Sequence, residues 1–104
     1  MGKKKIIRSP VGERLREIRT LRGISQKTLG IRAGIDQFSA SARINQYERE
    51  KHIPDYSTAS RLAKVLDIPV TYLFTDDDSL AEIILLYSQA SKKTQIQVKR
   101  LLKN

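Results

Sequence analysis

Apolar residues recur at intervals of three and four along most of the chain, the spacing that places them on one face of an α-helix. Leu15 and Ile18 follow this spacing in one segment, and Leu29 and Ala33 in the next. No segment shows the alternation of a β-strand, so the pattern predicts an all-α fold. The predicted helices cover about residues 10–22, 26–33, 40–49, 56–66 and 70–74, with two more after residue 79.

Residues that start and stop helices support these boundaries. Ser9 is a candidate N-cap, and Pro10 suits the first helical position. Gly23 and Gly34 stand where the first two helices should end. The third helix should begin between Ser39 and Ser41. The other predicted N-caps are Ser25, Asp55, Ser79 and Ser91.

The charge of the chain is strongly asymmetric. The formal net charge is +9, and 13 of the 20 Lys and Arg residues lie within residues 1–52. A basic half joined to a nearly neutral half suggests that the basic half binds a polyanion, with nucleic acid the first candidate. The alternative is a surface charge that only keeps the protein in solution.

Other classes of protein find little support in the composition. There is no cysteine and only one histidine, His52, so we expect no disulfide, no metal site and no cofactor. No Ser/His/Asp set, carboxylate pair or phosphate-binding loop suggests an enzyme. Because no apolar run has the length of a membrane span and no signal peptide is recognised, we expect no membrane partner and a cytoplasmic location.

The second and third predicted helices are short and joined through Gly34 and Ile35, an arrangement typical of a helix-turn-helix. Residues 11–74 resemble the lambda-repressor-like, Cro-type (XRE) DNA-binding domain. The resemblance implies a five-helix lambda-repressor-like domain over residues 9–75. It is carried by LREIRTLRGISQKTL (15–29), AGI (33–35), RINQYER (43–49), Pro54, ASRLAKVLDI (59–68) and VTYLF (70–74).

The resemblance also implies which residues read base edges from the third helix in the major groove. The matching positions are Ser41, Ala42 and Gln46. Ala42 suits a thymine methyl group, and Gln46 suits adenine, to which an amide makes two hydrogen bonds. Arg43 and Asn45 flank the same face, although Arg43 could instead reach a phosphate and Asn45 could simply face solvent.

Phosphate contacts are implied at two places. Gln26 matches a phosphate-contacting position at the start of the second helix, with Ser25 and Lys27 beside it, where free N–H groups favour an anion. Lys51 and His52 fall in the loop after the third helix, where a backbone N–H and a basic side chain would contact the backbone of DNA. The alternative for Gln26 is a solvated first-turn residue.

Arg19 and Glu48 match a pair that forms a buried salt bridge in similar domains and ties the first helix to the third. The expected role of this pair is structural. Removal of one partner would leave the other charge buried and unpaired. The alternative is an exposed, unpaired arrangement.

The chain departs from the family pattern in two places. The spacing from Ile35 to Ile44 is nine residues, longer than is usual in the family by about four. The extra residues either lengthen the turn or add one turn to the third helix, so Gln37 or Ser39 could also touch DNA. Glu50 stands where glycine is common, and we expect its carboxylate to point away from DNA or to pair with Lys51.

Residues 79–104 form a predicted C-terminal two-helix extension, and residues 1–8 a basic arm. The extension carries more apolar side chains than one packing surface needs, which indicates a homodimer interface. The alternative is that both helices fold back on their own domain. The arm could lie in a minor groove or remain a tail with only unspecific attraction for DNA. The expected interface residues are Leu80, Ile83, Ile84, Tyr87 and Leu101.

Taken together, these features predict a transcriptional regulator that binds double-stranded DNA sequence-specifically. The expected form is a homodimeric repressor that reads a palindromic operator. The alternative is an antitoxin-type interaction module whose C-terminal helices bind a partner protein.

Overall fold

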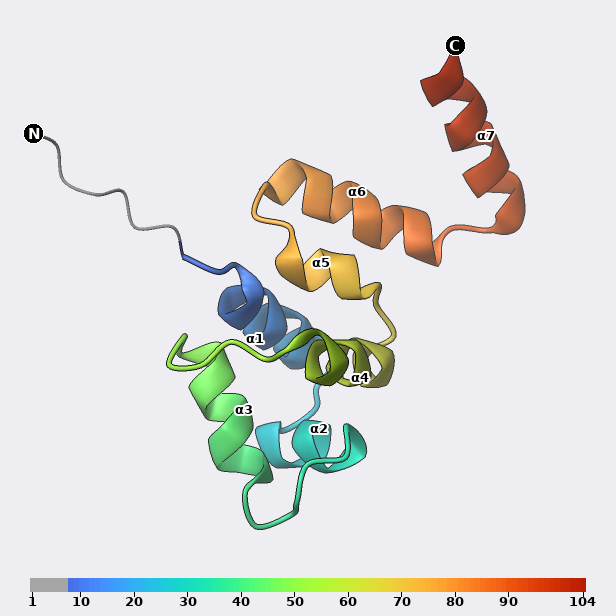
Figure 1. Ribbon diagram of the computed structural model, residues 1–104. Coiled ribbons are helices and arrows are strands. Elements are labelled where there is room, and N and C mark those ends of the chain that lie inside the picture. Colours follow the sequence, from blue (N-terminus) through green and yellow to red (C-terminus); the bar gives the residue numbers. More distant parts are fainter. Residues whose placement is uncertain (1–7) are drawn as a thin grey trace, which may run out of the picture.

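All regular secondary structure in residues 8–104, the part that the computed structural model describes, is α-helical (Figure 1). The predicted all-α fold is confirmed. The predicted arm over residues 1–8 lies outside the described residues, apart from Arg8. No described helix has the length and apolar character needed to cross a membrane. The helices are α1 (Val11–Leu21), α2 (Gln26–Arg32), α3 (Ala40–Glu48), α4 (Tyr56–Leu66), α5 (Val70–Phe74), α6 (Asp78–Gln89) and α7 (Lys92–Lys103).

The first two helices end at glycine, as the sequence predicts. Gly23 and Gly34 have positive φ values of 68° and 91°. After α1, the Gly23 N–H donates to Thr20 O and the Ile24 N–H donates to Arg19 O, the paired bonds of a Schellman motif. These bonds satisfy carbonyls that the helix leaves without partners and turn the chain sharply into α2.

The same motif ends α3 and α4, where Glu50 and Asp67 replace glycine with φ values of 61° and 57°. The left-handed conformation costs a residue with a Cβ atom about 1 to 2 kcal/mol. One expectation was that Glu50 pairs with Lys51, and the structure does not show this pair. The Glu50 carboxylate lies 3.8 Å from the Arg8 guanidinium, because the turn directs the side chain back toward the start of α1.

Side-chain caps begin most of the helices. Ser25, Asp55 and Ser91 each accept a hydrogen bond from the backbone N–H three residues later, as predicted. The prediction of Ser79 as a cap is wrong. Asp77 accepts from the Leu80 N–H instead, so α6 already begins at Asp78.

Two glycines allow α3 to approach its neighbours closely. A Cβ atom on Gly30 of α2 would lie 2.8 Å from the Cβ atom of Ala40, the first residue of α3. A Cβ atom on Gly12 of α1 would lie 2.6 Å from the carbonyl oxygen of Tyr47, near the end of α3. Real Cβ atoms do not come so close, so α3 is held at both ends by contacts that only glycine permits.

Leucine and isoleucine side chains from helices α1 to α5 fill the core. Leu15, Leu29, Ile44, Leu62 and Leu73 are fully buried, and each comes from a different helix. Because every one of the five helices contributes, none can be removed without exposing the interior.

Helix α6 rests on this core, whereas α7 does not. Ala81 is buried, and Ile84 and Leu85 pack against the core from the same side of α6. Arg14, itself buried, donates from Nε to Thr75 O and from Nη2 to Asp78 Oδ1, which fastens the α5–α6 link to α1. Helix α7 has no buried residue and stands away from the other helices beyond the end of α6 (Figure 1).

Candidate nucleic-acid interface

The segment between α2 and α3 is a loop, and α3 begins only at Ala40. Of the two possibilities for the additional residues, the structure has the lengthened turn and no added turn of helix. Asp36 closes this loop, since its carbonyl accepts from the Ser39 N–H and its carboxylate accepts from the Phe38 N–H, both at 3.0 Å. In Figure 1 the loop and the start of α3 lie at the end of the molecule farthest from α6 and α7.

One side of α3 is buried and the other is open. Ala40, Ile44 and Tyr47 face the core. At about 100° per residue, Ala42 and Arg49 then lie on the opposite side of the helix. The predicted base-contact residues all keep solvent exposure: Ser41, Ala42 and Arg43 are exposed, and Asn45 and Gln46 are half-buried.

Arg49 is a candidate that the sequence reasoning did not include. It is exposed and lies three residues after Gln46 and seven after Ala42, so it extends the same open side of α3. This spacing was visible in the sequence. The spacing identifies Arg49 as a candidate only when the buried side of α3 is known. The sequence did not determine this side exactly, because the lengthened turn made the first residue of the helix ambiguous.

A buried ion pair joins α1 to α3. Arg19 donates from Nε to Glu48 Oε2 and from Nη2 to Glu48 Oε1, the latter at 3.1 Å, while its Nη1 donates to Ile24 O. The Glu48 side chain is 3% exposed and the Arg19 side chain 16%. Two parallel hydrogen bonds fix the orientation of both groups, so the pair sets the position of α3 relative to α1.

Gln26 adds α2 to this network. Its Nε2 donates to Glu48 Oε1 at 3.1 Å and to Asn45 Oδ1 at 3.3 Å. The amide donors of Gln26 are therefore already used within the protein. A phosphate contact by this side chain requires the exchange of one of these bonds.

The other expected phosphate-contact residues differ in which of their hydrogen-bonding groups are already used within the protein. The Ser25 hydroxyl is engaged with Thr28, from whose N–H it accepts and to whose Oγ1 it donates. Lys27 is exposed. The backbone N–H groups of Lys51 and His52 both donate to Gln46 O as part of the turn that ends α3, so only the exposed side chains of these two residues can reach DNA.

Two shallow grooves border the open side of α3. One, of about 420 Å³, runs between Arg16, Gln26 and Arg49, and the other, of about 460 Å³, between Arg43, Gln46 and His52. Both contain basic and amide side chains, which are the groups that bind phosphates and base edges. Among residues 8–104 there is no cluster of three or more acidic or imidazole side chains that could hold a metal ion.

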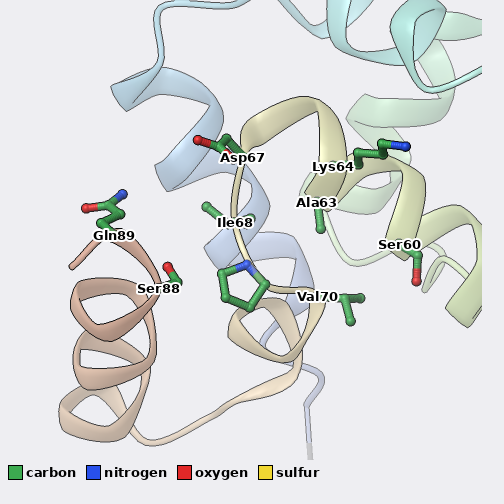
Figure 2. A pocket seen from close by; sticks show the side chains of 9 residues that line it. Ser60, Ala63, Lys64, Asp67, Ile68, Val70, Ser88 and Gln89 are labelled. Atoms are coloured by element: carbon green, nitrogen blue, oxygen red, sulfur yellow. The ribbon is translucent and has the colours of Figure 1, made fainter. Parts of the chain in front are cut away.

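Another groove, of about 700 Å³, lies elsewhere (Figure 2). It separates the α4–α5 junction from the end of α6, and Ser88 and Gln89 face Asp67 and Ile68 across it. Lys64 is the one cationic residue among those that line it, and no residue of α3 contributes. The groove is therefore separate from the candidate interface.

Comparison with known proteins agrees with this geometry. Residues 12–79 match the model of a family described as "Helix-turn-helix domain". The chain belongs to the helix-turn-helix family. The resemblance to XRE-type regulators inferred from the sequence is thereby confirmed.

Two individual proteins are similar to this helix-turn-helix protein. The solved structure of the transcriptional regulator BswR has 45% sequence identity and a TM-score of 0.84, and the match covers 89% of this chain and 92% of that one. An uncharacterized transcriptional regulator in the ATPase CF(0) region of Rhodospirillum rubrum is 35% identical over 66 residues, which are 64% of this chain. This match spans 57% of the relative's length.

We expect Arg19→Ala to lower the free energy of unfolding by about 3 to 5 kcal/mol, because the Glu48 carboxylate is then left buried without its partner. Denaturant unfolding followed by circular dichroism measures this loss. Arg16→Ala, a change of an exposed arginine on the same helix, serves as the control and should stay within about 0.5 kcal/mol of the wild type. Equal stabilities of the two variants would contradict a structural role for the ion pair.

Proposed function

We propose that this protein is a transcriptional regulator that binds double-stranded DNA sequence-specifically through α3 in the major groove. The supporting observation is the open side of α3, where Ser41, Ala42 and Gln46 are available to base edges. The ion pair and the two close glycine contacts hold that side in place. A recognition helix whose own position is rigid loses little freedom on binding, which favours affinity.

The basic character of residues 1–52 supports the same proposal. Three basic residues are exposed on either side of α3 in the sequence: Lys27 precedes the helix, and Lys51 and His52 follow it. We propose them as phosphate contacts, together with Ser25 and Gln26 at the start of α2. Base contacts are assigned to Ser41, Ala42, Arg43, Asn45 and Gln46.

We further propose that the protein acts as a homodimer formed by α6 and α7. Leu80 and Ile83 are 52% and 54% exposed on the side of α6 that turns away from the core, and Leu101 of α7 is 75% exposed. Half-buried Tyr87 lies beside them, whereas Ile84 is already partly buried against its own core. An apolar face of this kind is stabilised by association with a second copy.

A dimer of this kind reads a palindromic operator, because two-fold symmetry in the protein requires it in the DNA. Two copies of α3 then lie about 34 Å apart on one side of the duplex. We propose repression as the output, since a regulator that occupies its site blocks that stretch of DNA. The competing role is an antitoxin-type module, in which the same face of α6 and α7 binds another protein. Co-purification of a second polypeptide from the native source favours that role.

Selection of bound duplexes from a random pool tests the DNA-binding proposal, and affinity for the selected duplex should fall steeply with salt. Each phosphate contact releases counterions, so about four contacts lower the affinity about a hundredfold between about 50 and about 200 mM salt. Fluorescence anisotropy measures the slope. A flat response, or a pool that shows no enrichment, would contradict the proposal.

Gln46→Ala should cost about 1 to 3 kcal/mol of binding free energy on the preferred duplex and relax the preference at one base pair. The loss reflects two hydrogen bonds to one base. Gln97→Ala makes the same chemical change on α7 and should leave binding unchanged. If Gln46→Ala weakens every duplex equally, Gln46 contacts only the DNA backbone.

Ile83→Glu should raise the dimer dissociation constant at least about tenfold, because association would bury a charge without a partner. Analytical ultracentrifugation measures the change. Gln89→Glu places the same charge on an exposed position of α6 away from Ile83 and should leave the dimer intact. An Ile83→Glu protein that remains as dimeric as the wild type would place the interface elsewhere.

A further inference from the structure

Phe38 is the most exposed large apolar side chain among the described residues, at 89% of its full exposure. Single apolar residues on a surface are common and need no explanation by themselves. The position of this one is unusual, because it stands two residues before the first residue of α3, at the tip of the lengthened turn.

The backbone around Phe38 is fixed. Its N–H donates to the Asp36 carboxylate and the next N–H, of Ser39, donates to the Asp36 carbonyl. On the far side of Ser39, Ala40 is fully buried against Gly30. The ring is therefore carried outward by a closed turn that is anchored at the start of α3.

This placement directs the ring toward DNA if α3 binds as proposed above. The N-terminal residues of a recognition helix contact base edges in the major groove, and Phe38 lies two residues before the first of them. In Figure 1 this turn lies at the end of the molecule away from α6 and α7, where the face proposed for dimerisation does not cover it.

The chemistry of the ring limits what it can recognise. A phenyl group has no hydrogen-bond donor or acceptor and gains nothing from a phosphate. The apolar group that a base pair presents in the major groove is the C5-methyl of thymine, and phenylalanine is one of the side chains that contact it. Both groups are apolar, so a contact between them removes apolar surface from water, which is favourable.

We propose that Phe38 is a specificity-determining residue that packs its ring on the C5-methyl group of a thymine in each half-site. The inference rests on the proposed DNA-binding function and adds a residue outside α3 to the reading surface. The lengthened turn then has a role in recognition, because it projects a side chain that a shorter turn would not.

Replacement of thymine by deoxyuridine removes only the methyl group and tests the contact directly. In the selected duplex, each thymine is replaced in turn, and the dissociation constants of wild type and Phe38→Ala are measured. We expect one position per half-site at which deoxyuridine weakens wild-type binding about three- to tenfold. Phe38→Ala should show a similar loss on the original duplex and no further loss on the deoxyuridine duplex.

Two variants serve as controls. Phe38→Leu keeps an apolar side chain and should retain part of the thymine preference. Leu21→Ala removes an exposed apolar side chain from α1 and should keep the full wild-type response to deoxyuridine. Circular dichroism should show the same thermal transition for Phe38→Ala and wild type, because the ring contacts little of the protein.

Several results would overturn the inference. Phe38→Ala with wild-type affinity, or with the same loss as wild type at every deoxyuridine, removes the contact while leaving the DNA-binding function in place. A Phe38→Ala protein that changes its oligomeric state and not its DNA affinity assigns the ring to a protein interface. A wild-type protein that binds no duplex overturns the proposed function, and this inference with it.

Discussion

The Arg19–Glu48 ion pair is the interaction on which the candidate interface depends. It joins the C-terminal part of α1 to the last residue of α3, and Gln26 connects α2 to the same carboxylate. A buried pair of this kind contributes little net stability compared with apolar residues, but it penalises every arrangement in which the two charges separate. Its effect is therefore positional. The arrangement of the three helices that keeps Glu48 covered is therefore favoured, and that arrangement turns the opposite side of α3 outward.

The two ends of α3 depend on different constraints. At its start, Gly30 allows Ala40 to approach α2, and the turn closed by Asp36 leads the chain into the helix. At its end, Glu50 adopts a left-handed conformation that costs free energy. This conformation allows the last carbonyls of α3 to receive hydrogen bonds and turns the chain sharply toward α4. A surface that must match the spacing of base pairs benefits from such rigidity. Specific contacts are then made without first ordering the helix that carries them.

The two sides of α6 differ in what they contact. The side of α6 with Ala81 and Leu85 extends the core, and Arg14 fastens the preceding link to α1. The opposite side of α6 is exposed at Leu80 and Ile83, and α7 has no buried residue. Of the two alternatives for these helices, packing on the chain's own domain therefore applies to one side of α6. Association with a second copy through the opposite side is the proposal made above.

By itself, the sequence determined the helices and most of their caps, because these depend on local spacing, on glycine and on short-range hydrogen bonds. The partners of the Arg19–Glu48 ion pair came from the family resemblance. The family pattern carried the placement of Ser41 to Gln46 on α3. Only the tertiary structure decided the length of the turn before α3, the partner of Glu50 and the exposure of Arg49 and Phe38. Each of these depends on how closely helices approach one another across the core. That distance is set by contacts between residues far apart in the chain, which periodicity along one segment does not contain.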